Sequence, residues 1–440
     1  MAYIKRTIID LKRSYDKLHK IYKSILFQGL LYNIMFFLNS FMMGRIGEYE
    51  ISAIGMGMQF LWISQAIVQS SGAAVGLLVS RNWGKGDSYR IPEQLVSSII
   101  VATFKFTLIA LLVFWQTDRI VSFYTQNPMI ADRLRTFLMI SIWELIFSGI
   151  AMVYESVFQN TNKNKIVSRV YLMELIVNIG LVFLLVELIS MGIAGVAVAS
   201  LLTKLLKFMY LFINYELGYA IRKKQIWKQI SQILRVATPI LIESFLWNIG
   251  SMIIVHSIGR LSVSEVTVYS VFVSTLYVLI VPVEAYARTI KVYLGQLFGK
   301  SNEIARLEIK NLIRLNQVAI FLVIIATILY FFNVEHFYRS IEGDTSNLFI
   351  QLLPLMLIYI IFKCQNELVS NGLLQVGLDN TFKCIFECIV IATTYLLLLV
   401  LNEDIFSIFL VLVIIEIIRF VVLSVRAYGG KWLKKASFLD

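Results

Sequence analysis

Apolar residues dominate this chain in long blocks that are separated by short polar segments. A bilayer core of about 30 Å is crossed by about 20 apolar helical residues, and lipid admits only helices and closed barrels because every backbone group must be satisfied internally. A barrel would instead show alternating segments of about 10 residues. We therefore predict an all-α integral membrane fold. Its twelve transmembrane helices are expected over residues 24–43, 53–79, 95–115, 136–157, 167–189, 193–214, 237–258, 266–293, 311–333, 348–371, 381–401 and 405–425.

Composition supports this interpretation. Of the 440 residues 58% are hydrophobic and 15% are charged, and the mean hydropathy is +0.76, whereas soluble domains have about 45–50% apolar and 25% charged residues. The three cysteines, Cys364, Cys384 and Cys388, all fall in predicted helices and have no histidine nearby in the sequence. We expect neither a disulfide framework nor a resident metal.

The net charge of +12 does not indicate nucleic-acid binding, because the Lys and Arg lie in short loops between apolar spans. If the N-terminus is cytoplasmic, the inner segments carry several times as many Lys and Arg as the outer loops. Cytoplasmic loops carry such an excess in membrane proteins. We expect a multi-pass protein of the plasma membrane with both termini in the cytoplasm and no nucleic-acid partner.

The chain also contains an internal repeat. A shift of 215 residues aligns the first two spans of each half: Asn33 overlays Asn248, Gly44 and Arg45 overlay Gly259 and Arg260, Glu50 overlays Glu265, and Gly84 and Lys85 overlay Gly299 and Lys300. A shift of 216 residues aligns the loops after spans four and ten, where Gln159 overlays Gln375 and Asn164 overlays Asn380. Because each half holds an even number of spans, both halves enter from the same side, as parallel repeats do. Such repeats are typical of transporters that work by alternating access.

The repeat gives the domain organisation. We predict a cytoplasmic segment over 1–23, a six-helix bundle over 24–214, a basic cytoplasmic linker over 215–236, a second six-helix bundle over 237–427 and a cytoplasmic tail over 428–440. The two bundles are expected to be pseudo-symmetric.

Several motifs resemble those of the multidrug and toxic compound extrusion (MATE) family, over essentially the whole chain. They are LNSFMMGRIGEYEISAIGMG, LLVSRNWGKGD with its second-half counterpart YLGQLFGKSN, VFQNTNKNK, VNIGLVFLLV and MGIAGVAVAS. The resemblance implies export of amphipathic, often cationic compounds, driven by an inward Na⁺ or H⁺ gradient. It implies no cofactor other than that transported ion.

The chain departs from the family pattern at its usual first-half cation site. The first-span position that is acidic in the family is Asn39, and the fifth-span position that is acidic in some members is Val182, although Asn178 matches a family Asn. The seventh-span acid of other members falls at Trp247, and Glu243 lies one turn earlier. Coupling, if present, is therefore expected mainly in the second half. Glu243 is the leading carboxylate, unless it only pairs with an inner-loop cation such as Arg235.

Ionisable groups at membrane depth cost about 2.5–3.5 kcal/mol on insertion scales, so each one needs a reason. Lys105 and Glu144 are expected to form an ion pair between neighbouring helices, and Lys204 and Lys207 to extend to the inner interface. We take as candidate contacts for substrate or cation Glu243, Trp247, Asn248, Glu284, Arg288, Asn33, Asn39, Asn178, Lys363 and Glu367.

Span eight carries the most charged stripe of any predicted helix, with Glu284 and Arg288 at i,i+4 spacing and Lys291 beyond them. We expect an intrahelical pair that points into the protein rather than at lipid, with Pro282 bending the helix just before it. The stripe is either a buried network or the wall of a polar cavity. Its net positive charge suits an anionic or zwitterionic ligand.

Together these features predict a secondary transporter for amphipathic small molecules, working as a monomer in the bilayer as an Na⁺- or H⁺-coupled antiporter. A flippase or exporter for a lipid-linked glycan or another anionic amphiphile is the alternative. An enzyme is disfavoured, because the sequence has no HExxH, GxSxG or Walker motif and its three histidines are scattered. A non-transporting scaffold would have no reason to keep polar residues in a cleft.

Overall fold

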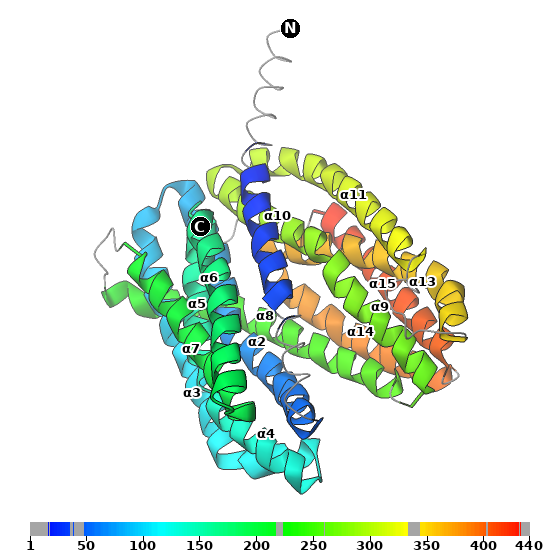
Figure 1. Cartoon of the computed structure of the whole chain (residues 1–440). Helices are drawn as coiled ribbons and strands as arrows, with labels where there is room; N and C mark the ends of the chain where they lie inside the picture. Colours follow the sequence, from blue (N-terminus) through cyan, green and yellow to red (C-terminus); the bar gives the residue numbers. More distant parts are fainter. Residues whose placement is uncertain are drawn as a thin grey trace. The chain divides into compact units, whose positions relative to one another are not determined.

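A computed structural model describes residues 16, 18–35, 38, 48–216, 223–258, 260–332, 344–401, 404–430 and 432. Within these residues the fold is built from helices without any strand (Figure 1). The elements are a helix over 18–35, α2 (Glu48–Lys85), η1 (Ser88–Arg90), α3 (Ile91–Tyr124), α4 (Pro128–Ser141), α5 (Glu144–Asn160), α6 (Asn164–Val182), η2 (Phe183–Leu188), α7 (Gly192–Ile213), α8 (Lys223–Ile258), α9 (Val263–Leu279), α10 (Val281–Lys300), α11 (Asn302–Phe332), α13 (Asp344–Glu367), η3 (Leu368–Leu374), α14 (Asn380–Val400) and α15 (Ile405–Tyr428).

Eight of the described helices are long and apolar enough to cross a membrane, and up to ten spans result if each bent helix pair counts as one. The bent pairs are α4 with α5, at 41°, and α9 with α10, at 42°. The predicted bend before Glu284 is confirmed, since Pro282 lies in the first turn of α10. Of the two further predicted spans, 24–43 is only partly described, and 311–333 contains the shorter apolar stretch Ile320–Leu329.

Helix bounds agree with the internal repeat. A shift of 215 residues carries the bounds of α2, Glu48 and Lys85, onto the start of α9 and the end of α10, Val263 and Lys300. A shift of 216 carries the loop before α6 onto the loop before α14. Asn162 (φ 63°) and its counterpart Leu378 (φ 58°) both adopt the left-handed conformation there. Positive φ is uncommon for residues other than glycine, so its occurrence at both equivalent positions indicates that the two turns have the same backbone geometry.

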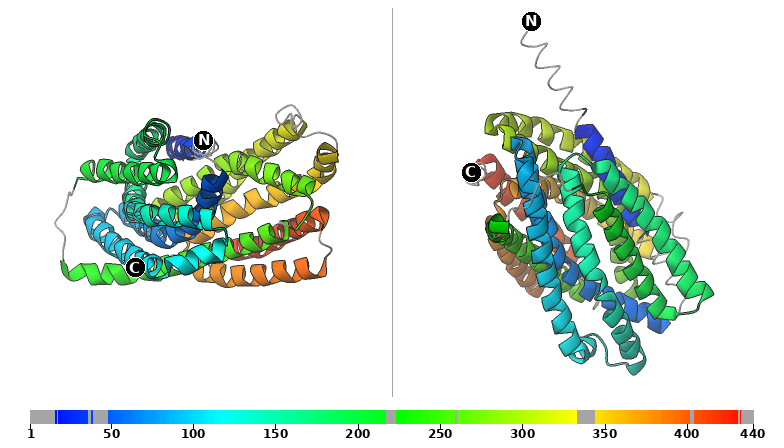
Figure 2. Two further views of the ribbon diagram at one scale, coloured as in Figure 1. Left: turned by 60° about the horizontal axis from the view of Figure 1, so that its bottom comes forward. Right: turned by 90° about the vertical axis from the view of Figure 1, so that its left-hand side faces the viewer.

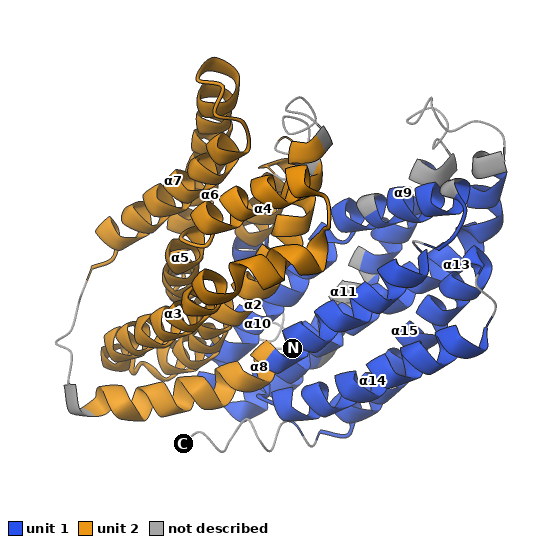
Figure 3. Ribbon diagram, turned by 90° about the horizontal axis from the view of Figure 1, so that it is seen from below, with its two compact units in different colours: residues 1–22, 242–440 blue, residues 23–241 orange. Residues whose placement is uncertain are grey.

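The chain divides into two compact units, coloured separately in Figure 3. We call residues 23–241 the N-terminal unit and residues 1–22 together with 242–440 the C-terminal unit. Helix α8 contributes its residues up to Leu241 to the first unit and those from Ile242 to the second.

The N-terminal unit packs around α2, which contacts α3, α4 and α5. Glycines permit this close approach: a Cβ on Gly72 would lie 2.6 Å from Cγ of Met152 and 3.0 Å from its carbonyl oxygen, and a Cβ on Gly149 would lie 2.2 Å from Cγ1 of Val68. Small residues bring helix backbones together in membrane proteins for this reason. Helices α6 and α7 complete the unit, side by side (Figure 2).

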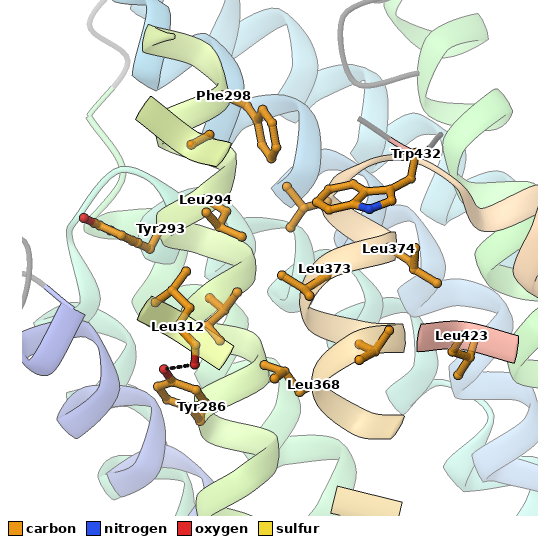
Figure 4. Packing of buried hydrophobic residues seen from close by; sticks show 14 of the residues in the cluster. Tyr286, Tyr293, Leu294, Phe298, Leu312, Leu368, Leu373, Leu374, Leu423 and Trp432 are labelled. Atoms are coloured by element: carbon orange, nitrogen blue, oxygen red, sulfur yellow. Dashed lines mark hydrogen bonds between the residues drawn. The ribbon is translucent and has the colours of Figure 1, made fainter. Parts of the chain in front are cut away.

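The C-terminal unit is held by two apolar clusters, one of which is drawn in Figure 4. Trp432, only 1% exposed, packs its ring against Phe298 and over Gly377, where a Cβ would lie 2.3 Å from the ring. The Tyr286 hydroxyl donates to the Leu312 carbonyl at 2.9 Å, which ties α10 to α11. These contacts fix the helices that carry the charged residues described next.

Candidate functional site

Six charged side chains on four helices of the C-terminal unit, here called the C-unit charge cluster, form two ion-paired groups. The members of the cluster are Glu243 on α8, Lys363 on α13, Lys383 and Glu387 on α14, and Glu416 and Arg419 on α15. Glu387 of one group interacts electrostatically with Glu243 and Lys383 of the other. Three carboxylates face three cations, so the cluster is neutral when all six groups are charged. Such pairing is what allows charges to persist inside a membrane protein.

Glu243 lies one turn after Pro239 of α8 and pairs with Lys383, at 2.7 Å between Oε1 and Nζ. The Lys383 side chain is 2% exposed, and its ammonium also donates to Oδ1 of Asn371 at 3.3 Å. Asn371 in turn donates to Glu367 at 2.8 Å. It belongs to the π-helical segment η3, and such segments often occur at functional sites. The partner of Glu243 is therefore Lys383 rather than the Arg235 that we considered from sequence.

Trp247 lies one turn beyond Glu243 and is a cation–π partner for two residues of the same unit. Nζ of Lys363 is 3.8 Å from the ring centroid, and Cζ of Arg419 is 4.8 Å from it. The residue is still 40% exposed. The protein's own cations thus lie against a ring that we took as a candidate contact for substrate, and they disfavour a second cation there.

Glu416 and Glu387 complete the C-unit charge cluster. Glu416 accepts from Nδ2 of Asn366 at 2.6 Å and lies 3.5 Å from Nζ of Lys363, while Glu387 binds Nη2 of Arg419 at 2.6 Å. Lys363 is thus paired with Glu416 of α15, and Glu367, its i+4 neighbour, is bound by Asn371.

Helix α10 carries the predicted pair of Glu284 and Arg288, which the structure confirms at 3.9 Å. The pair is loose, and the Arg288 and Glu284 side chains are 60% and 40% exposed. Lys291 donates to Oε1 of Gln375 at 3.2 Å. The pair itself is formed as predicted, but the heads of Glu284 and Arg288 are not turned into the packed helices of the unit as expected; they are partly exposed.

The N-terminal unit has a charge cluster of its own on α5, α6 and α7, here called the N-unit charge cluster. Nζ of Lys207 lies 2.6 Å from Glu155 and 2.7 Å from Glu174, and Lys204 also binds Glu174. Tyr171 packs its ring 4.1 Å from Nζ of Lys207 and donates to Glu155. The prediction that Lys204 and Lys207 extend to the interface is wrong, because α7 turns both ammonium groups onto buried carboxylates.

The predicted pair of Lys105 and Glu144 is not formed. Lys105 donates to the Ser70 hydroxyl at 2.6 Å, and Glu144 accepts from Gln65 at 3.0 Å. Both partners come from α2, which packs against α3 and α5. Lys105 and Glu144 are thus each hydrogen-bonded to a neutral side chain of α2 instead of to one another.

The remaining candidates are amides. Asn33 and Asn248, equivalent in the repeat, each donate to the carbonyl four residues earlier, at 2.9 Å to Gly29 and 2.7 Å to Ser244. Asn178 is 3% exposed and donates to Thr203 at 3.5 Å. Asn39 lies outside the described residues. The shared geometry of Asn33 and Asn248 matches their sequence equivalence.

Sequence reasoning missed Glu155, Glu174 and Lys383, three central members of the two clusters. All three lie in predicted spans. The signal that marks them in the sequence is an ionisable side chain within an apolar span, which is costly in a membrane and therefore needs a partner. For Lys383 that signal lies in the first turn of its span.

Comparisons with known proteins give the family. The MatE family model matches residues 24–184 and 239–382, more than half of the chain. A curated relative from Buchnera aphidicola subsp. Baizongia pistaciae, described as a probable multidrug resistance protein NorM, is 25% identical over 389 residues, which cover 80% of this chain and 82% of the relative.

Solved structures show the same fold. The crystal structure of the eukaryotic MATE transporter AtDTX14 aligns with a TM-score of 0.83 at 17% identity and covers 96% of this chain and 97% of that one. A MOP superfamily transporter from Pyrococcus furiosus, with a binding pocket described as of reverse polarity, aligns with a TM-score of 0.81 at 13% identity and the same coverage. The predicted fold class is confirmed. Since the MatE model matches both halves of the repeat, the chain belongs to the MATE family of multi-pass membrane transporters.

Proposed function

We propose that this protein is a secondary active antiporter that exports amphipathic small molecules by alternating access, with Na⁺ or H⁺ as the coupling ion. It acts as a monomer in the plasma membrane with both termini in the cytoplasm, and it uses no cofactor besides the transported ion. Membership of the MATE family supports the transporter class. The relative described as a probable multidrug resistance protein supports a drug-like substrate.

The exposed charges of α10 are the observation that carries this proposal. Arg288 and Glu284 lie inside a predicted span, yet their side chains are 60% and 40% exposed. Acyl chains cannot solvate a guanidinium or a carboxylate, so charged residues in spans face a protein interior or a water-filled path. A helix face of this kind is expected along a substrate pathway and has no use in a purely structural membrane helix.

Glu243 is the proposed coupling carboxylate. Asn39 and Val182 cannot exchange a proton, which leaves the first-half positions named above without a titrating group. Glu174 and Glu155 of the N-terminal unit are held by Lys204 and by the buried Lys207. Glu243 retains 15% exposure of its side chain and can therefore exchange with the aqueous phase more readily than these two.

A second candidate function is export or flipping of an anionic amphiphile. Arg288 is the more exposed member of its pair, and Lys291 has an amide as a hydrogen-bond partner. The solved transporter with a pocket of reverse polarity has the same fold and is described as suggesting a different function. This candidate predicts that anions are preferred to cations of similar size and hydrophobicity.

Transport into proteoliposomes tests both candidates. Purified protein is reconstituted, gradients of H⁺, Na⁺ or voltage are imposed one at a time, and accumulation of ethidium, a cationic probe, is compared with that of an anilinonaphthalene sulfonate, an anionic one. The antiporter proposal predicts accumulation above protein-free vesicles when the lumen is acidic or Na⁺-rich. Gradient-independent equilibration of both probes would reject it, and preference for the anion would favour the second candidate.

A further inference from the structure

The ion pair of Glu243 and Lys383 places oxygen atoms from two side chains around one lysine ammonium. A carboxylate oxygen of Glu243 and the amide oxygen of Asn371 both lie around one buried ammonium, at 2.7 and 3.3 Å. Oxygen ligands of these two types are what a hard monovalent or divalent cation takes in proteins. Here the cation is covalently attached to α14 and cannot leave.

We propose that Lys383 is a tethered cation that fills the place of a free Na⁺ beside Glu243, so that the C-terminal unit is independent of Na⁺ and coupled to protons. This inference rests on the proposed antiporter function for its coupling step. The part of the inference that concerns the filled cation site is independent of that function, because it is argued only from the contacts of the Lys383 ammonium with Glu243 and Asn371.

Charge at the site excludes a second cation. The lysine ammonium is a compact point charge, and its side chain is 2% exposed. Lys291 of α10 and Glu387 of α14 are close enough to interact electrostatically with Glu243 or Lys383. Glu387 is itself neutralised by Arg419 of α15, at 2.6 Å. A Na⁺ ion beside Glu243 would therefore meet the charges of Lys383 and Lys291, while the Glu243 and Glu387 carboxylates already have cations of the chain as partners.

A proton can still reach the pair, because it needs no vacant volume. Protonation of the Glu243 carboxylate from the aqueous phase removes its charge and breaks the ion pair, which frees the ammonium to turn toward Asn371 and Glu367. Release of the proton restores the pair, so each cycle moves one H⁺ and no Na⁺.

The first experiment measures thermal unfolding of the purified full-length protein in detergent, in NaCl, KCl and choline chloride at equal ionic strength. The wild type is expected to have the same Tm in all three salts. Lys383→Ala leaves Glu243 and Asn371 around an empty volume, so this variant is expected to be less stable in choline chloride and to regain about 3–8 °C with Na⁺ in a saturable way. Adding Glu243→Gln should abolish the response.

Two results would overturn the proposal. One is saturable Na⁺ stabilisation of the wild type that Glu243→Gln removes, because the site would then already hold a free ion. The other is a Lys383→Ala variant that elutes as a monodisperse peak yet shows no selective response to Na⁺. If Lys383→Ala does not fold, the wild-type salt comparison decides: an equal Tm in NaCl, KCl and choline chloride agrees with the proposal, and a higher Tm in NaCl that Glu243→Gln removes contradicts it.

Transport separates this inference from the proposed function. Replacing Na⁺ by choline on both sides of the vesicle should leave proton-driven accumulation of the preferred probe within twofold of its rate in Na⁺. If no probe accumulates under any gradient, the antiporter function fails while the thermal comparison still reports on the cation site. If probe accumulates only with a Na⁺ gradient, the function stands and the tethered-cation proposal fails.

Discussion

At the scale of single residues, a buried carboxylate in each unit, Glu174 and Glu416, is paired with a cation of the chain. Glu174 is 1% exposed and binds two lysines, and Glu416 is 3% exposed and binds Lys363. Removing one member of a buried pair is costly because it leaves an uncompensated charge. Replacing both members by groups of similar shape costs less. The pairs are therefore expected to behave as units in mutagenesis.

Lys207→Met tests this in the N-terminal unit. Lys207 binds both Glu155 and Glu174, whereas Lys204 binds Glu174 alone, so loss of Lys207 leaves Glu155 without its cation. We expect Lys207→Met to destabilise the protein by about 3–5 kcal/mol and Lys204→Met by clearly less. Thermal unfolding in detergent measures both, and Glu155→Gln should partly rescue Lys207→Met. Equal losses for the two lysines would contradict this account of the cluster.

Arg288→Gln tests the exposed face of α10. Removing the positive charge should lower the ratio of anionic to cationic probe transport by about tenfold, equivalent to about 1.4 kcal/mol, through KM rather than folding. Arg135→Gln is the matched control, since its pair with Asp118 is also exposed but lies on α4 and α3. Transport kinetics with both probes provide the measurement. An unchanged ratio in Arg288→Gln would show that this arginine does not contact the substrate.

At the scale of helices, most spans could be predicted from sequence because a crossing helix needs about 20 apolar residues. The bend before Glu284 was predictable from Pro282, and the repeat was predictable from aligned residues such as Asn33 and Asn248. The charge partners were not predictable. Lys383 and Glu243 lie far apart in the chain, and their contact depends on how α8 and α14 are rotated about their axes. Hydropathy contains no information on that rotation.

Close packing of α2 gives a prediction at this scale. A Cβ on Gly72 meets the backbone of Met152 at 3.0 Å, whereas a Cβ on Gly55, in the same helix, meets nothing within 4 Å. Gly72→Ala is therefore expected to cost about 1–3 kcal/mol through overpacking, and Gly55→Ala to be neutral or slightly stabilising. Thermal unfolding of both variants in one detergent is the measurement. A loss in Gly55→Ala as large as in Gly72→Ala would indicate a general sensitivity of α2.

At the scale of the whole molecule, the two units share a repeat and differ in their charged residues. The N-unit charge cluster joins α5, α6 and α7, and the C-unit charge cluster joins α8, α13, α14 and α15. Only the second cluster includes a carboxylate, Glu243, on the helix that continues from one unit into the other. Protonation of Glu243 would therefore break a contact made by α8 itself, its ion pair with Lys383 of α14.

Proton-driven transport in the Glu243→Gln variant tests the central claim most directly. Wild-type and variant proteoliposomes with an acidic lumen are compared for accumulation of the preferred probe and, without a gradient, for exchange of labelled against unlabelled probe. We predict that Glu243→Gln abolishes accumulation driven by the pH gradient and keeps exchange, because the variant still alternates but carries no proton. Accumulation in the variant at the wild-type level, with the same dependence on pH, would contradict the account.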